Sequence, residues 1–184
     1  LRPQVKTHKT IELGLWQLCS VSGRSTTTRS TRSCSGIVAS TVAEVRFFAQ
    51  GDMRFSDILY GVPLCLTKIA ALLELQNTCA AKLHVPIEHP APLAALLQAL
   101  KTLKEKDGTS FESAHPIGVF IKIDCDYHRA GLIYDGALVA TVLGQGKGLL
   151  SFSGIYSHSG HSYTIGGDRE SISAIALEEV HRME

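Results

Sequence analysis

Short apolar segments alternate with longer amphipathic ones along most of this chain. The clearest apolar segment, IGVFIKIDC at 117–125, is nearly continuous from Val119 to Ile123 and predicts a strand that is covered on both faces. The amphipathic segments between such runs predict helices. Regular alternation of this kind is typical of βα units joined into a parallel sheet.

About six βα units are predicted when the opening segment is included. The predicted strands are 1–10, 36–40, 57–63, 82–88, 117–125 and 149–160, and the predicted helices are 41–51, 66–77, 91–108, 136–146 and 169–183. Thr41 and Glu44 have the spacing of a capping box, and Pro86 favours an edge position for its strand. We predict an α/β fold, an incomplete (β/α)8 TIM-type barrel; a doubly wound open sheet is the alternative.

The bulk properties of the chain exclude several classes of protein. A net charge of +1 over 184 residues predicts neither a nucleic-acid nor a membrane-surface partner. No apolar run reaches the length of about 18 residues that a membrane span needs. The five cysteines are odd in number and contain no C-x-x-C pair, which argues against a disulfide framework. We therefore expect a cytoplasmic protein without membrane or nucleic-acid partners.

Polar side chains follow the predicted strands where a barrel would place its functional residues, at the carboxyl ends. Their convergence predicts a site for an anionic, aromatic ligand. His158 and His161 have a spacing that can suit a metal, but no adjacent carboxylate or cysteine completes a ligand set, so we predict no metal site. The candidates are Lys6, His8, Asp124, His128, Arg129, His158, His161, Ser162 and Tyr163.

Four stretches resemble, in order, motifs of the fold-type III pyridoxal-phosphate family that contains D-serine dehydratase and D-threonine aldolase and shares the alanine racemase barrel. The four stretches are RPQVKTHKT, DILYGVPL, VFIKIDCDYHRAGL and GIYSHSGHSY. Together they extend over nearly the whole chain. The resemblance implies that Lys6 forms the Schiff base with the cofactor, and that Arg129 hydrogen-bonds its phenolic oxygen. It also implies that the cofactor pocket is lined by His8, His161, Ser162 and Tyr163.

Two positions depart from the family motifs. Gln4 stands where a histidine is usual, and Asp126 stands where a glycine is usual. If the turn at Asp126 needs a positive φ, aspartate is among the few other residues that tolerate it. Lys122 precedes Arg129 by the spacing of a lysine that is carbamylated in some alanine racemases.

The resemblance implies a lyase acting on a small D-β-hydroxy-amino acid, either by dehydrating D-serine to pyruvate and ammonia or by cleaving D-threonine. A racemase and a non-catalytic pyridoxal-phosphate-binding protein are the alternatives. The family's phosphate loop, its zinc ligands and its β-rich second domain are not found in residues 1–184, which would form part of the barrel domain. We expect zinc assistance and a homodimer only in the full-length protein, and we expect these residues alone to be inactive.

Overall fold

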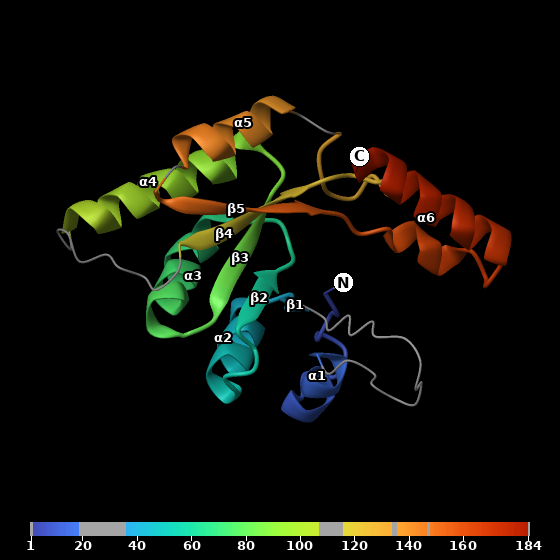
Figure 1. Ribbon diagram of the computed structural model, residues 1–184, viewed down its shortest axis with the longest axis horizontal. Coiled ribbons are helices and arrows are strands. Elements are labelled where there is room, and N and C mark those ends of the chain that lie inside the picture. Colours follow the sequence, from blue (N-terminus) through green and yellow to red (C-terminus); the bar gives the residue numbers. More distant parts are fainter. Residues whose placement is uncertain (1, 19–35, 107–115, 134–135, 147, 184) are drawn as a thin grey trace, which may run out of the picture.

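A computed structural model describes residues 2–18, 36–106, 116–133, 136–146 and 148–183 of the chain. Helices and strands alternate along it (Figure 1). In chain order they are α1 (Ile11–Leu18), β1 (Ile37–Ala39), α2 (Val42–Gly51), β2 (Asp57–Tyr60), α3 (Leu66–Thr78), β3 (Lys82–Ile87), α4 (Pro90–Lys106), β4 (Ile117–Lys122), α5 (Gly136–Gln145), β5 (Leu150–Tyr156), the 3-10 helix η2 (Gly160–Thr164) and α6 (Arg169–Met183).

The five strands form one parallel sheet in the order β1-β2-β3-β4-β5. Each strand therefore lies next to its neighbour in sequence, and helices α2 to α5 lie along the same side of the sheet (Figure 1). A doubly wound sheet reverses its strand order and places helices on both faces. The observed arrangement is that of a partial (β/α) barrel, as predicted.

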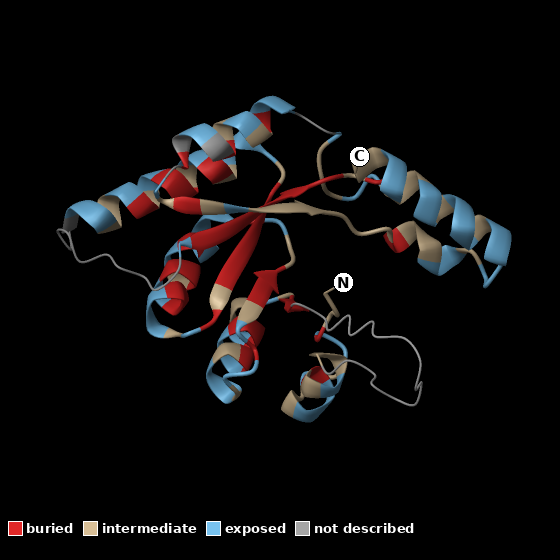
Figure 2. Ribbon diagram, viewed as in Figure 1, coloured by how far each residue is buried: buried red, intermediate tan, exposed pale blue. Residues whose placement is uncertain are grey.

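The main core lies between the sheet and these helices. Figure 2 shows the buried residues along the strands and on the helix faces turned toward them. Phe48 of α2 and Phe55 are fully or nearly fully buried, and their rings pack edge to face with centroids 5.0 Å apart. A smaller cluster on the opposite, inner face contains Val38, Leu59 and Phe120. The strands thus carry apolar side chains on both faces, which explains their continuous apolar sequences.

The capping box that the sequence predicts at the start of α2 is present in a shifted form. Thr41 Oγ1 accepts a hydrogen bond from the Glu44 backbone N at 3.1 Å. Glu44 Oε2 accepts one from the backbone N of Ser40 at 2.7 Å, one residue before the cap. The first bond satisfies an N–H group that the first turn of the helix leaves without a partner, and the second satisfies the N–H of the residue before the cap.

The prediction of a strand over 1–10 is wrong for most of that segment. Only Gln4 forms a parallel bridge, with Val38, and two backbone hydrogen bonds flank it. The backbone N of Lys9 then bonds to Val5 O at 2.9 Å, and Lys9 has a φ of 53°. Because the chain turns after Val5, Lys6 and His8 do not share a strand face. Helix α1, which the sequence analysis missed, follows directly.

Pro86 does not lie in an edge strand. It occupies β3, between β2 and β4, and it pairs with Phe120 of β4. The last pair between β2 and β3 is Leu59 with His84. Because Pro86 lies beyond that pair, its missing N–H interrupts no pairing with β2, and the proline is tolerated in a central strand.

The C-terminal elements lie outside the main core. All six residues of β4 are buried, whereas only Leu150 is buried in β5, which forms one edge of the described sheet. Helix α6 extends away from the end of β5 and buries none of its residues (Figures 1 and 2). The predicted end of the helix over 91–108 lies partly outside the described residues. No helix in the described part of the chain is long and apolar enough to cross a membrane.

Candidate functional site

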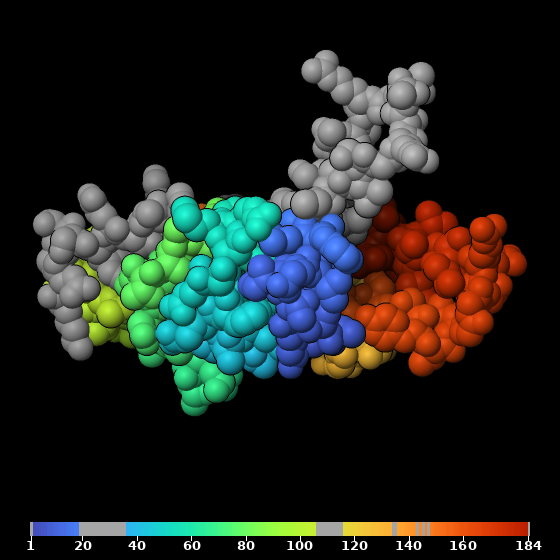
Figure 3. All heavy atoms as spheres, turned by 90° about the horizontal axis from the view of Figure 1, so that it is seen from below, coloured from blue at the N-terminus to red at the C-terminus, as the bar shows by residue number. Residues whose placement is uncertain are grey.

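Basic side chains from three separate parts of the chain converge on His158, which follows β5. The pKa of His158 is lowered below 6.5, first by burial and then by the positive charges of Arg129, Lys6 and Lys122; the charge of Glu179 opposes this. Figure 3 shows the N-terminal segment (blue) between α2 (cyan) and the C-terminal segment with α6 (orange and red). The fold therefore brings together the carboxyl ends of distant strands, as a barrel requires.

Lys122 is the last residue of β4 and is only 4% exposed. Its Nζ lies 3.7 Å from Glu88 Oε2, just beyond the end of β3. Burial is the main cause that lowers the pKa of Lys122; the charge of Arg129 lowers it further, and Glu88 opposes both. A buried ammonium group needs such a counter-charge.

The loop after β4 is held by two carboxylates that face one imidazole. Asp124 accepts hydrogen bonds from the backbone N of Tyr127 at 3.1 Å and of His128 at 3.0 Å. The His128 ring lies between Asp124 Oδ2, 3.1 Å from Nδ1, and Asp126 Oδ1, 3.2 Å from Nε2. Asp126 has a φ of 69°, the positive value anticipated from its place in a glycine position, and His128 has a φ of 53°. These contacts offset the cost of two left-handed residues in one short loop.

Arg129 is placed by the ring of Tyr127. Its Cζ lies 4.7 Å from the ring centroid, and its Nη1 donates to the Tyr127 hydroxyl at 3.4 Å. A guanidinium held over an aromatic face keeps its charge and its directional donors. Arg129 is otherwise exposed, so its remaining N–H groups face the open side of the site.

Aromatic rings gather where β5 ends and η2 begins. The ring centroids of Tyr127 and His161 are 5.8 Å apart, and those of His158 and Tyr163 are 5.9 Å apart. A Cβ added at Gly160 would lie 2.4 Å from the Tyr127 ring, so only glycine fits between these rings. His161 Nδ1 is buried and has no hydrogen-bond partner among the described residues. Ser162 lies in η2, and Tyr163 is 75% exposed.

The opening segment contributes Lys6, and the residues that follow Lys6 contact α1 and α2. Lys6 itself is exposed, and Lys9 Nζ lies 3.3 Å from Glu44 Oε1. His8 is turned toward α1, where its Nε2 lies 3.0 Å from Gln17 Oε1 and its Nδ1 accepts from the backbone N of Thr10. The structure thus brings Lys6, Arg129, His161 and Tyr163 to one region, whereas the contacts of His8 are made with α1.

Tyr156 and His158 also belong to the site, although the resemblance to the family assigned no role to either. Tyr156 ends β5 in register with Lys122. An added Cβ at Gly61 would lie 3.6 Å from its hydroxyl, so this side chain reaches across the inner face toward the end of β2. Burial raises the pKa of Tyr156, and the charge of Arg129 opposes the rise. Their position at a strand end was a signal for both residues, and the sequence analysis noted it only for His158.

Helix α6 contacts the same loops. Ser157 donates a hydrogen bond to Glu179, and Arg182 Nη2 lies 3.2 Å from Asp126 Oδ1. A cavity of about 390 Å³ lies between α6 and the inner face of the sheet. It is lined by Arg2, Phe120, Ile155, Tyr156, Ser157, Glu179 and Met183.

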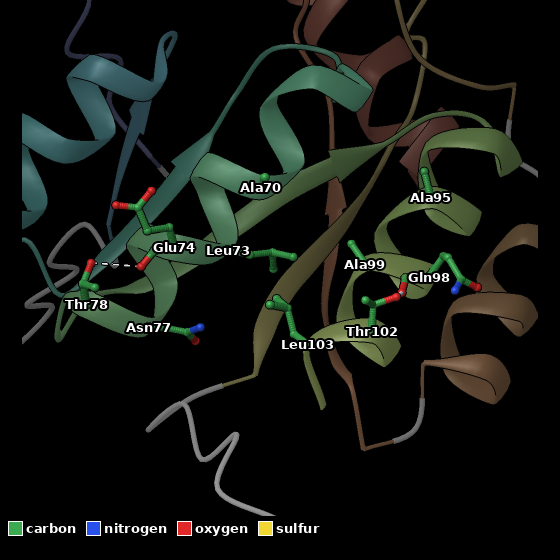
Figure 4. A pocket seen from close by; sticks show the side chains of 10 residues that line it. All are labelled: Ala70, Leu73, Glu74, Asn77, Thr78, Ala95, Gln98, Ala99, Thr102 and Leu103. Carbon is green, nitrogen blue, oxygen red and sulfur yellow. Dashed lines mark hydrogen bonds between the residues drawn. The ribbon is translucent and has the colours of Figure 1, made fainter. Parts of the chain in front are cut away.

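A second cavity, of about 760 Å³, lies between α3 and α4 on the outer layer (Figure 4). Its walls include Leu73, Ala99 and Leu103, and Thr78 in its lining bonds back to Glu74 O at 2.9 Å. This groove is remote from the strand ends and contains no grouped basic or aromatic side chains. Within the described ranges, no three His, Cys, Asp or Glu side chains are placed to hold a metal ion.

Comparison with known proteins points to one group of enzymes. No family model matches the chain. The chain is 34% identical to D-serine dehydratase of Dictyostelium discoideum over 97% of its own length and 42% of the relative's. It is 34% identical to D-serine dehydratase of Schizosaccharomyces pombe over 88% and 36%, and 30% identical to D-threo-3-hydroxyaspartate dehydratase of Delftia sp. over 97% and 41%. The chain thus spans about two fifths of the length of these curated relatives.

Solved structures share the fold at lower identity. D-threonine aldolase from Filomicrobium marinum matches with a TM-score of 0.67 and 19% identity, over 99% of this chain and 43% of the aldolase. Alanine racemase of Clostridium difficile matches with a TM-score of 0.57 and 13% identity, over 82% of this chain and 36% of the racemase. These two similarities support the barrel architecture.

Proposed function

Because this chain belongs to the fold-type III pyridoxal-phosphate family that contains D-serine dehydratase and D-threonine aldolase, we propose that it is the cofactor-binding barrel of a lyase. The substrate would be a small D-amino acid with a β-hydroxyl group: D-serine, which gives pyruvate and ammonia, or D-threonine, which undergoes aldol cleavage. The observation that carries this proposal is the grouping of Arg129 with the rings of Tyr127, His158 and His161 at the carboxyl ends of β4 and β5.

The residues at the strand ends fit pyridoxal phosphate at three points. The cofactor has an aldehyde, a phenolic oxygen and a flat aromatic ring, so it requires an amine, a cationic donor and ring surfaces. Lys6 would bind the aldehyde carbon through Nζ, and Arg129 would donate to the phenolic oxygen. His161 would offer its partnerless, buried Nδ1. Tyr163 and Ser162 would line the same pocket, with His8 at its N-terminal side, and no described residue is assigned to the phosphate.

When it is bound, pyridoxal phosphate supplies an electron sink for negative charge at the substrate α-carbon. In the dehydration, Lys6 Nζ would take the α-proton, whereas in the aldol cleavage a base would take the proton of the β-hydroxyl as the Cα–Cβ bond breaks. The charges of Lys122 and Arg129 would attract the substrate carboxylate. His158, with its lowered pKa, is neutral at neutral pH and can pack its ring against an aromatic ligand. In the full-length protein we propose that zinc assists the loss of the β-hydroxyl; among the residues described in this chain, no group fits a metal ion.

The lyase proposal is tested on the full-length protein with two product assays, pyruvate from D-serine and glycine from D-threonine. We expect one of the two products, and we expect Lys6→Ala to abolish it. Lys68→Ala is the matched control, because Lys68 is an exposed lysine in α3. Bound cofactor without product from either substrate would overturn the lyase proposal.

Two other outcomes identify the remaining functions. Racemisation of an amino acid that survives treatment with a chelator would identify a racemase on the same barrel. Cofactor absorbance that depends on Lys6 but is accompanied by no turnover of any D-amino acid would identify a cofactor-binding protein.

A further inference from the structure

A buried polar network crosses the inner face of the sheet at the opposite end of the strands from the candidate site. Arg2 forms a two-pronged ion pair with Asp57, the first residue of β2, and the Nη2–Oδ2 bond measures 3.0 Å. His84 Nε2 of β3 lies 3.0 Å from Asp57 Oδ1, within ion-pair distance but not aligned for a hydrogen bond. Its Nδ1 lies 2.9 Å from Ser153 Oγ of β5. The network therefore connects the opening segment to β2, β3 and β5.

Two glycines provide the space that this network occupies. A Cβ at Gly36 would lie 2.5 Å from Arg2 Nη1 and 2.8 Å from Asp57 Oδ1. A Cβ at Gly118 would lie 2.0 Å from His84 Nδ1 and 2.7 Å from Ser153 Oγ. At both positions, any residue larger than glycine would displace side chains of the network.

The electrostatics of Asp57 are dominated by these partners. Burial by itself would raise the pKa of Asp57, but its interactions with His84 and Arg2 lower the value to about 2. The Arg2 guanidinium also lies 5.1 Å from the Phe120 ring centroid, so its apolar face is packed. A partly buried, two-pronged pair of this kind is geometrically specific as well as favourable.

The network bears directly on Lys6, because Arg2 and Lys6 belong to one short segment. That segment joins the sheet through the single bridge of Gln4 with Val38. An ion pair to a carboxylate holds it on each side of Lys6: Arg2 to Asp57 before it, and Lys9 to Glu44 after it. Backbone hydrogen bonds from Val5 N to Val38 O and from Val38 N to Pro3 O, and the fully buried side chain of Val5, also hold the segment. The Asp57 carboxylate is therefore one of the contacts that influence the position of the Lys6 amine.

We propose that Asp57 is a positioning residue for Lys6, acting through Arg2 from the far end of the barrel. This inference rests on the proposed role of Lys6 as the residue that binds the cofactor. It predicts that loss of the Asp57 charge loosens the segment 2–6 and weakens cofactor binding. A displacement of this kind far from the chemistry can cost about 100-fold in rate.

The test measures amide hydrogen exchange in residues 2–10 of the full-length protein without cofactor, and cofactor affinity by absorbance. For Asp57→Asn we expect exchange at Val5, whose backbone N bonds to Val38 O, to rise about tenfold and cofactor affinity to fall about tenfold. Asp52→Asn is the matched control, because Asp52 is similarly exposed but forms a local ion pair with Arg54, two residues further along the chain. Unchanged exchange and unchanged affinity in Asp57→Asn would overturn the proposal.

Arg2→Met provides a second variant that leaves the contacts of Asp57 with His84 intact, so it tests the proposal if Asp57→Asn fails to fold. We expect the same rise in exchange. The double variant, with Asp57→Asn and Arg2→Met combined, should show no larger rise in exchange than either single variant. If Arg2→Met leaves exchange at Val5 unchanged, the proposal is wrong. If exchange rises but Lys6→Ala binds cofactor normally, the positioning holds and the proposed role of Lys6 fails.

Discussion

Replacing Glu88 with glutamine removes the counter-charge of a buried lysine. Lys122 Nζ lies 3.7 Å from Glu88 Oε2, and the lysine side chain is 5% exposed. Breaking a buried pair by removing one partner costs about 3–5 kcal/mol, because the other charge stays buried without compensation. We therefore expect Glu88→Gln to lower the free energy of unfolding by about that amount at pH of about 7.

The pH dependence follows from the direction of the Lys122 shift. Its pKa in the folded protein lies below the unfolded value near 10.5, so the unfolded state binds more protons in that interval and stability rises with pH. Glu88 raises this pKa, and its removal lowers the pKa further. The stability gap between the variant and the parent protein therefore narrows as the pH rises to about 9, where the amine of the variant is increasingly neutral.

The assay is urea unfolding of the full-length protein, followed by circular dichroism at the two pH values. Glu74→Gln is the matched control, because Glu74 Oε1 lies 3.9 Å from Arg46 Nη2 in an exposed pair. Such pairs contribute about 0–1 kcal/mol. If Glu88→Gln is no less stable than Glu74→Gln, or if its deficit grows with pH, the reasoning about the buried lysine is refuted.

Two further predictions concern glycine and the charge near His158. Gly118→Ala should lower the free energy of unfolding by about 1–3 kcal/mol, because its Cβ would lie 2.0 Å from His84 Nδ1. Gly144→Ala in α5 is the control: its Cβ meets nothing within 4 Å, so the substitution should be neutral or stabilising by about 0.5–1 kcal/mol. Denaturant unfolding measures both variants. Arg129→Met should raise the pKa of His158 toward 6.5 in an NMR titration, because a positive charge that lowers this pKa is removed. Arg46→Met, the control, should leave the pKa of His158 unchanged. If the pKa of His158 is also unchanged in Arg129→Met, Arg129 does not act on His158.

Much of the fold could be predicted because its signals are local. The apolar periodicity of strands and helices is set by each segment's own geometry, so the alternation indicated the parallel sheet and its covering helices. Hydroxyl and carboxylate spacing indicated the cap at Thr41 for the same reason. Residues that follow strands have to meet at one end of a parallel sheet, and this indicated that Arg129 and His158 lie in one region.

The exceptions arise where a distant partner determines the outcome. Pro86 was assigned to an edge, but β2 stops pairing with β3 before reaching it, and the length of β2 cannot be read from the residues around Pro86. Residues 1–10 were predicted to form a strand, yet the bond from Lys9 N to Val5 O turns the chain after Val5.

By itself, the sequence determined the order of the elements and the end of the sheet at which polar groups gather, because both follow from the backbone period. Only the tertiary structure decided which charges are paired. Glu88 faces Lys122, and Asp57 faces Arg2 and His84, across strands that are far apart in the chain. The energy of a charge depends on its burial and on the distance to its counter-charge, and neither quantity exists until the strands have assembled.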